Sequence, residues 1–215
     1  WRERRWSMAE IEALKSVAGA LGAAFSRQKI EAIERQHRAL TEALRDSAAA
    51  LNSTLNLDDV LDQMLGIIAR VVPHDAAEIM LVDETTLLCQ VVRSHGYDGR
   101  GVYQWLTQLR LSIEDTPNLR YMARTLKPCI VANPHNDPQW IVFPETDWIN
   151  SHVSAPIHFK GQLIGFLNLN STTQNFFTPA DAERLKVFAD QAAVAIENAR
   201  LYKATQQNAS ELASL

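Results

Sequence analysis

The sequence has little cysteine, no excess of positive charge and no long apolar run. Its 215 residues include only Cys89 and Cys129, whose spacing fits neither a metal site nor a disulfide framework, so we expect two reduced thiols. The net charge of −4 gives no basic surface for nucleic acid. No apolar run approaches the roughly 18–20 residues of a membrane span. We therefore expect a cytoplasmic protein with no membrane segment and no nucleic-acid partner.

The chain also lacks an initiator methionine and the apolar core of a signal peptide. It opens with WRERR, a charged segment that no hydrophobic stretch follows. This beginning is expected of a fragment excised from a longer protein.

What the chain does contain is one helical sequence twice. Residues 6–18 read WSMAEIEALKSVA, and residues 177–189 read FTPADAERLKVFA, at a constant offset of 171. Both copies begin with an aromatic residue, a Ser or Thr N-cap and an acid in the first turn. Identical pairs occur at Ala9/Ala180, Glu12/Glu183, Leu14/Leu185, Lys15/Lys186, Ala18/Ala189 and Ala24/Ala195. Such self-similarity indicates repeated units, so the first copy is predicted to close a preceding domain whose body is missing.

Residues 7 to about 52 are predicted to form a nearly continuous helix. Ser7 followed by Glu10 forms a capping box. Apolar residues then recur at spacings of three and four, but the phase slips between Phe25 and Ile30. We interpret the slip as a junction between a domain face and a two-stranded coiled-coil linker that has His37 in its seam. So long a helix cannot bury itself alone, which favours a homodimer.

The remaining pattern predicts an α+β fold. Asn56 caps a helix that Pro73 ends, Thr116-Pro117 starts a second helix that runs to about residue 126, and Thr178 caps a long final helix. Strands are predicted at residues 76–82, 87–93, 129–132, 152–159 and 162–170, the last two forming a hairpin around the turn Lys160-Gly161. Gly165 suits a close backbone approach or a bulge. Residues 95–110 are expected to be irregular, and residues 133–150 to form a long loop with one helical turn. Antiparallel strands with the helices gathered at one face make an α+β sandwich.

This pattern resembles the GAF domain, a small-molecule sensory module of signalling proteins. The matching blocks are SAPI at 154–157, GQLIGFL at 161–167, FTPAD at 177–181, AAVAIENARLY at 192–202 and LNLDDVL at 55–61. The resemblance implies an antiparallel sheet of about five to six strands with helices on one face. It divides the chain into the end of a truncated preceding GAF domain (1–29), a helical linker (30–54), a GAF domain (55–202) and an outgoing helix (203–215).

The family's pocket lies between the sheet and the irregular segments. Those segments carry Tyr97, Tyr103, Trp105, Tyr121, Trp140 and Trp148, and pockets favour aromatic walls with a few polar groups. Several of these rings are equally expected simply to cover a small core. Arg93, Arg110, His152 and Asn168 are the nearby polar candidates. The predicted ligand-binding set is Arg93, Trp105, Tyr121, Trp140, Trp148, His152 and Asn168.

Specific ligands known from the family are not supported by the sequence. The cyclic-nucleotide motif is incomplete: Asn170, Phe177 and Asp181 match it, whereas Ser171 and Ala182 stand where Lys and Glu are needed. The Lys–Asp ion pair of that motif therefore cannot form in the same way.

Other cofactors are equally without a motif. Neither Cys89 nor Cys129 is followed by the His common at bilin attachment sites, and two strand cysteines do not resemble the reactive set of the GAF-fold sulfoxide reductases. His152 and His158 lie six residues apart on one predicted strand face, too far apart to share a metal, although one of them could ligate a haem. The cofactor is therefore unknown, with no bilin, haem or metal motif.

Two classes of function remain open. The chain contains no nucleophile elbow, phosphate-binding Gly loop or paired-metal carboxylate set, so the fragment is not expected to be an enzyme. The resemblance implies a sensory domain that binds a small molecule and signals through dimeric helices to an output domain, of which a histidine kinase is the first choice. The alternatives are a ligand-free dimerisation and relay module, or a regulatory domain of a nucleotide or diguanylate cyclase.

Overall fold

The computed structural model describes most of the chain. The described residues are 7–10, 12–18, 21–22, 24–25, 27–29, 56–83, 85–138 and 140–213. The chain divides into two units, residues 1–41 and residues 42–215. Within these described ranges, no helix is long and apolar enough to cross a membrane.

The first unit is helical at every described position from residue 8 to residue 29. Ser7 Oγ accepts a hydrogen bond from the backbone N–H of Glu10 (3.2 Å), and the Glu10 carboxylate accepts one from the N–H of Ser7 (2.8 Å). The predicted capping box is thus confirmed. The large apolar side chains of this unit are exposed: Met8, Leu14, Val17, Leu21 and Phe25. The predicted coiled-coil linker, residues 30–54 with His37, lies outside the described residues.

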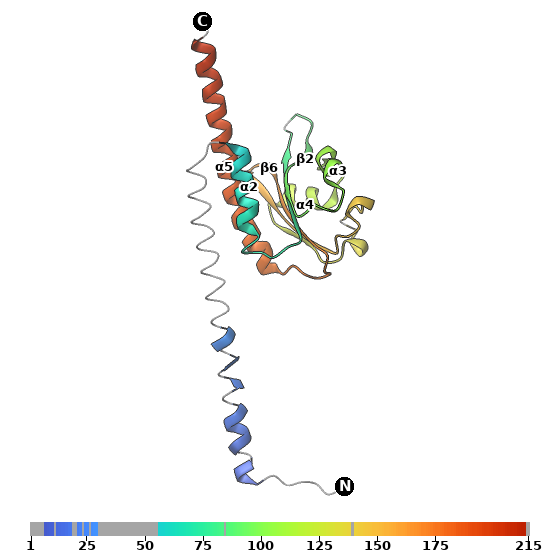
Figure 1. The fold of residues 1–215 in the computed structure, drawn as a ribbon, viewed down its shortest axis with the longest axis vertical. Coiled ribbons are helices and arrows are strands. Elements are labelled where there is room, and N and C mark those ends of the chain that lie inside the picture. Colours follow the sequence, from blue (N-terminus) through green and yellow to red (C-terminus); the bar gives the residue numbers. More distant parts are fainter. Residues whose placement is uncertain are drawn as a thin grey trace. The chain divides into compact units, whose positions relative to one another are not determined.

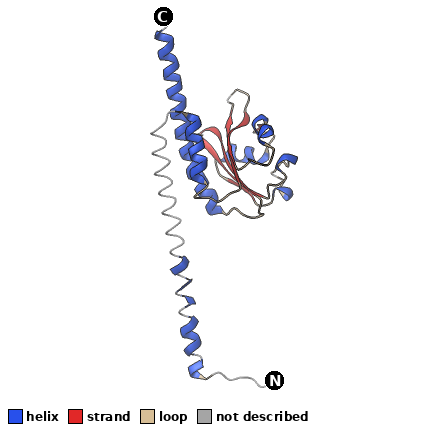
Figure 2. Ribbon diagram, viewed as in Figure 1, coloured by secondary structure: helices blue, strands red, loops and turns tan. Residues whose placement is uncertain are grey.

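The second unit is built on one antiparallel sheet of six strands (Figure 2). The strands are β1 (Ala76–Val82), β2 (Leu88–His95), β3 (Arg110–Ser112), β4 (Cys129–Val131), β5 (Ser151–Phe159) and β6 (Gln162–Ser171). Their order is β3-β2-β1-β6-β5-β4, which places β1 and β6 at the centre. The predicted α+β class and strand number are confirmed.

Four α-helices accompany the sheet: α2 (Leu57–Ile68), α3 (Tyr103–Gln108), α4 (Pro117–Thr125) and α5 (Pro179–Ala213). Helices α2 and α5 pack against each other on one face (Figure 1). The short helices α3 and α4 cover the opposite face, where their side chains join a buried cluster with Met80 and Phe166. The expected arrangement on one face therefore holds for α2 and α5, and α3 and α4 add a second layer.

The connecting segments contain more structure than the sequence predicts. The stretch expected to be irregular, residues 95–110, contains α3 and leads into β3. The loop at 133–150 contains two short 3-10 turns, Pro134–Asn136 and Pro144–Thr146. The one helical turn predicted in that loop thus corresponds to two, whereas α3 and β3 were not predicted because they are too short to show a hydrophobic period.

The N-terminal ends of α2 and α5 are capped as predicted. The Asn56 side chain accepts a hydrogen bond from the N–H of Asp58 (2.9 Å) and so caps α2. Thr178 caps α5: its Oγ1 accepts from the N–H of Asp181 (3.3 Å), and the Asp181 carboxylate accepts from the N–H of Thr178 (2.9 Å). This is the Ser7–Glu10 geometry repeated at the offset of 171 residues.

Two glycines of the β5–β6 hairpin have different physical roles. Lys160 and Gly161 both have positive φ (50° and 84°), as a two-residue hairpin turn of type I′ requires. Gly165 lies in β6, where a Cβ would be 2.1 Å from the carbonyl oxygen of Met80 on β1. The predicted close backbone approach at Gly165 is confirmed, and any side chain there would push the two central strands apart.

We therefore expect Gly165→Ala to lower the free energy of unfolding by several kcal/mol, since it forces a backbone shift between β1 and β6. Gly66→Ala is the matched control, because Gly66 lies exposed in α2 with open space around its Cα. That change should leave stability unchanged or raise it by up to about 1 kcal/mol. Urea unfolding of both variants measures the difference, and equal effects would contradict the close approach.

Candidate ligand-binding site

A cavity of about 70 Å³ lies between the sheet and the layer formed by α3, α4 and the loop at 133–150. We call it the Glu78 cavity, after the acidic residue that β1 contributes to it. Its walls are mainly apolar and include Trp105 and Phe143, whose ring centroids are 5.4 Å apart. The sheet contributes a polar floor of Glu78, His152, Asn168 and Asn170, and Thr116, Asn118 and Thr146 add polar groups to the otherwise aromatic and aliphatic walls.

The floor is a connected hydrogen-bond network. Tyr97 Oη donates to the carboxylate of Glu78, and Asn170 Nδ2 donates to the same Oε2 atom at 2.9 Å. Asn170 Nδ2 also lies 2.9 Å from Tyr97 Oη. On the neighbouring strand Ser154 Oγ donates to Asn168 Oδ1. All of these side chains are buried, so β1, β5 and β6 carry a polar cluster inside an apolar domain.

Burial dominates the electrostatics of Glu78. Removal from water raises the pKa of its carboxyl group from 4.5 to about 7, although hydrogen bonds from Tyr97, Asn170 and Asn168 oppose the rise. The pKa of Tyr97 is raised well above its ordinary value, first by burial and then by the adjacent Glu78 charge. Near neutral pH the cavity therefore contains an acid poised between its two protonation states.

His152 on β5 is neutral, and one of its ring nitrogens has no partner. Burial lowers its pKa from 6.5 to about 4. Asn170 uses its NH₂ group for Glu78 and Tyr97, so its Oδ1 accepts from Nδ1–H of His152 at 2.8 Å. This leaves Nε2 of His152 as a buried acceptor with no hydrogen-bond partner among the described residues. The Trp140 ring lies over the imidazole with a centroid distance of 4.5 Å.

Four of the predicted ligand-binding residues line the cavity: Trp105, Trp140, His152 and Asn168. Their role in binding a ligand stays a prediction. Tyr97, which the sequence also placed among the aromatic walls, lines it as well. Glu78, Asn118 and Thr146 were not predicted. The signal for Glu78 was one acidic residue inside the otherwise apolar strand AAEIMLV.

The other three predicted residues lie outside the cavity. Tyr121 is exposed on α4, and Trp148 packs edge-on against Tyr97 at 5.9 Å. Arg93 points toward α2, where it forms ion pairs with Asp58 (2.5 Å) and Asp62 (3.3 Å). The reason is a β-bulge in β2. Met80 pairs with Val91 and Ile79 pairs with Arg93, so β2 has one extra residue between these pairs. Val91 therefore faces the cavity, and Arg93 lies on the other face of the sheet.

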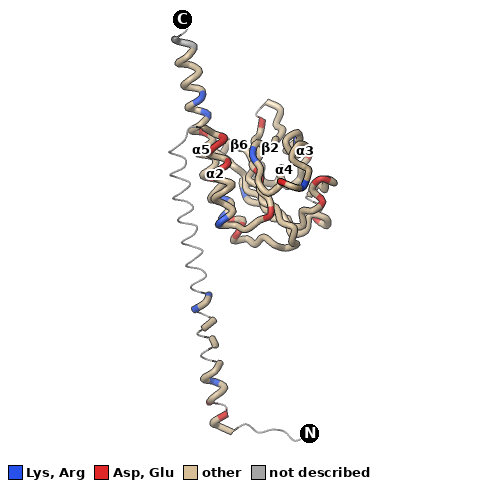
Figure 3. Tube along the Cα trace, viewed as in Figure 1, with Lys and Arg blue, Asp and Glu red and all other residues tan. Residues whose placement is uncertain are grey.

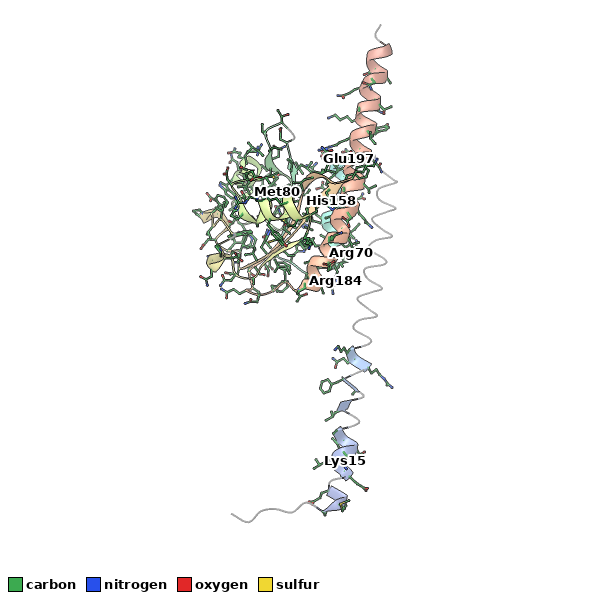
Figure 4. All side chains as sticks on the ribbon, turned by 180° about the vertical axis from the view of Figure 1, so that it is seen from behind. Lys15, Arg70, Met80, His158, Arg184 and Glu197 are labelled. Carbon is green, nitrogen blue, oxygen red and sulfur yellow. The ribbon has the colours of Figure 1, made fainter. Side chains whose placement is uncertain are left out.

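His158 and His152 have different surroundings. Their six-residue spacing predicted one shared face, yet Nε2 of His158 lies 3.9 Å from a carboxylate oxygen of Asp190 on α5 (Figure 4). The register of β5 and β6 shifts between Ile157 and His158. Among the described residues no group of three His, Cys, Asp or Glu side chains could hold a metal ion.

Comparison with known proteins identifies the family. The family model described as "GAF domain" matches residues 54–197. The chain belongs to the GAF domain family. GAF domains are regulatory and sensory domains of signalling proteins. Among curated proteins, no sequence matches the chain.

Solved GAF structures share the fold at low sequence identity. The GAF domain of a phosphoenolpyruvate-protein phosphotransferase from Coxiella burnetii is 19% identical, with a TM-score of 0.67, covering 78% of this chain and 98% of that one. Free methionine-R-sulfoxide reductase from Neisseria meningitidis, solved with its substrate, is 16% identical (TM-score 0.62; 76% and 91%). The phycoerythrobilin-bound GAF domain of a cyanobacterial phytochrome is 19% identical (TM-score 0.61; 76% and 97%).

The two cysteines of this GAF domain are buried thiols with raised pKa values. Both are buried, and burial raises the pKa of Cys89 to about 12 and that of Cys129 to about 11. The thiolate is the nucleophilic form of cysteine, and at neutral pH it is scarcely populated at either position. Each side chain packs in the apolar cluster beneath α3 and α4.

The network predicts opposite pH effects from Glu78 and His152. The raised pKa of Glu78 gives a stability contribution that is full below pH 4.5 and is lost as the pH rises through about 7. The lowered pKa of His152 gives one that is full above pH 6.5 and is lost as the pH falls through about 4. In the wild type the two residues therefore change the free energy of unfolding in opposite directions between pH 4.5 and 6.5.

Glu78→Gln removes one of these two contributions. Relative to the wild type, the free energy of unfolding of the variant should therefore rise by about 1–3 kcal/mol between pH 5 and pH 8. Urea unfolding at several pH values tests this expectation. A difference between the two proteins that stays constant with pH would show that Glu78 does not titrate in this range.

Proposed function

We propose that this GAF domain senses a small molecule bound in the Glu78 cavity and relays its presence through α5 to an output domain, such as a histidine kinase or a cyclase. The observation that supports it best is the buried Nε2 of His152, which no described residue contacts with a hydrogen bond and which lies beside an aromatic-walled cavity. Buried polar groups are generally hydrogen-bonded, and an exception calls for an explanation. A bound ligand that donates to this nitrogen supplies one.

Strand β5 connects the cavity to the helix. His152 lies on the cavity side of β5, whereas the adjacent Val153 is buried and faces the other side of the sheet, on which α5 packs. A ligand that shifts β5 would thus act directly on the base of α5. Two arrangements of one packed helix are the kind of two-state element that couples distant sites.

We further propose that the chain is not an enzyme and acts as a homodimer through its long helices. The buried thiols support the first proposal. The Neisseria protein of similar fold is a sulfoxide reductase, and a reductase that used cysteine would need a reactive thiolate, which the raised pKa values of Cys89 and Cys129 disfavour. The second is supported by the length of α5 and by the exposure of Leu201 and Tyr202 on its distal part. A ligand-free relay module is the alternative function.

The ligand proposal is tested by thermal-shift screening of a metabolite library against the whole chain. Compounds that bind the cavity should raise the melting temperature of the wild type and lose most of this effect in Trp105→Ala, which removes a cavity wall. Tyr121→Ala is the control, because Tyr121 is exposed outside the cavity. No stabilising compound in the library, together with no small molecule retained in native mass spectrometry, would favour the relay module.

We also propose that residues 6–27 are the closing helix of a preceding GAF domain. The buried residues at the start of α5 are Phe177, Ala182, Leu185, Phe188, Ala189, Ala192, Ala193, Ala195 and Ile196. At the offset of 171 residues these positions correspond to Trp6, Ile11, Leu14, Val17, Ala18, Leu21, Gly22, Ala24 and Phe25, which are all apolar or small. The first copy thus has the side chains of a core-facing helix, and Leu14, Val17, Leu21 and Phe25 are exposed in this chain.

A helix exchange tests this equivalence. Replacing residues 177–198 by residues 6–27 should give a chain that still unfolds cooperatively, at a lower melting temperature, because apolar residues fall on the buried face. Replacing the same residues by residues 8–29 is the control, since a shift of two residues turns the apolar face by about 200°. This second chimera should not fold. Equal behaviour of the two chimeras in circular dichroism melts would refute the equivalence.

A further inference from the structure

The Glu78 cavity is lined by one acid and by no lysine or arginine among the described residues. The cationic side chains near it have other partners. Arg93 pairs with acids of α2, and the Arg100 guanidinium lies 3.8 Å from the centre of the Trp148 ring. A carboxylate or phosphate ligand would therefore meet Glu78 without a compensating charge, which disfavours anionic ligands.

Neutral groups alone satisfy Glu78. The hydrogen bonds to its carboxylate come from one phenol, Tyr97, and two amides, Asn168 and Asn170. An ionised carboxylate buried in this way lacks the cation that usually accompanies it. A positive charge brought by the ligand would supply that partner.

Besides the Glu78 carboxylate, the cavity presents a second hydrogen-bond acceptor, Nε2 of His152. With Nδ1–H committed to Asn170, Nε2 of His152 can only accept a hydrogen bond. Asn170 lies between this ring and Glu78, so both acceptors belong to one hydrogen-bond network, and a ligand with several N–H donors matches their chemistry. Arg and amidine-type groups present such donors in a planar fork.

The walls and rim of the cavity suit the same chemistry. Trp105, Trp140 and Phe143 present aromatic rings, whose faces attract cations and planar rings. Glu145 and Asp147, which are acidic, lie in the turn beside the wall residue Thr146 (Figure 3). Their negative field would draw cations toward the cavity.

We propose that the Glu78 cavity binds a small planar organic cation, of the amidine or aromatic-amine class, with its N–H donors directed at Glu78 and His152 and its apolar body against Trp105 and Phe143. This inference rests on the proposed small-molecule sensing function and names its ligand class. The cavity has a volume of about 70 Å³ and opens to solvent, so a ring can extend beyond it and its volume alone sets no upper limit on ligand size.

Three probes of one shape test the charge preference: benzamidine (cation), benzamide (neutral) and benzoate (anion). Calorimetry with the whole chain at pH 8 should show benzamidine binding at least tenfold more tightly than benzamide, with no binding of benzoate. Acetamidine, acetamide and acetate repeat the comparison without the ring, so that a size limit is not mistaken for a charge preference.

Variants locate the binding. Glu78→Gln should weaken benzamidine binding at least tenfold and leave benzamide binding within about twofold. Tyr121→Ala, at an exposed position that does not line the cavity, should change neither. Benzamidine affinity should also rise between pH 6 and pH 8 as Glu78 ionises. The other groups that face this network titrate outside that window: the pKa of Tyr97 lies well above it and that of His152 at about 4, and Arg100 acts on Tyr97 as a constant charge. Since the probe comparison uses the wild type, it holds even if Glu78→Gln fails to fold.

The outcomes separate the two proposals. Equal or tighter binding of benzamide or benzoate, or an effect of Tyr121→Ala as large as that of Glu78→Gln, would overturn the cationic class and leave the sensing function intact. If no probe of either series binds but a library compound does, the class is again wrong. If nothing binds in any assay, the sensing function itself fails.

Discussion

The buried carboxyl group of Glu78 is the constraint on which the polar interior depends. It lies on the central strand β1, and its acceptor oxygens determine which way the amide of Asn170 points. That orientation in turn determines the tautomer of His152, one strand further along the sheet. A polar network of this kind is costly unless each member is satisfied, and within the described part of the chain this one ends in an acceptor that has no partner. The apolar residues that line the cavity surround this hydrogen-bond network and limit its contact with water.

Sequence reasoning predicted the longer helices and strands and missed the short elements α3 and β3 and the β-bulge in β2. Residues with strong local signals were assigned correctly: the caps Ser7, Asn56 and Thr178, the turn at Lys160-Gly161, and the close approach at Gly165. Arg93 was named as a polar candidate because it lies near the expected pocket, but the bulge opposite Ile79 and Met80 places it on the other face of the sheet. A bulge has no sequence signature of its own here, so the positions beyond it are placed by the backbone alone. Glu78 was not named as a candidate because residues 76–82 were considered only as a strand. An acid in an otherwise apolar strand conflicts with the strand pattern, and such conflicts are expected at functional or strained sites.

The two copies of the helical sequence show one sequence motif in two different surroundings. In α5 the motif's apolar face is buried against the sheet, and its small residues allow close packing. In the first unit the same capping geometry starts a helix whose large apolar side chains are exposed. Local sequence therefore specifies the helix, and tertiary contacts decide whether its face is covered. Within a family of signalling domains, this allows one element to finish one domain and continue as a connection toward the next.

Helix α5 also acts as a lever. It runs without interruption from Pro179 to Ala213, 35 residues, which corresponds to a rod about 52 Å long. Its early turns are clamped on β5, and its later turns are exposed. Among the described residues of α5, Ile196 is the last buried one, and Ala213 lies 17 residues further along, or about 25 Å. A tilt of one degree about Ile196 displaces Ala213 by about 0.4 Å, so a tilt of a few degrees moves it by about 1–2 Å. A small change in how α5 packs on the sheet would thereby displace the far end of the helix.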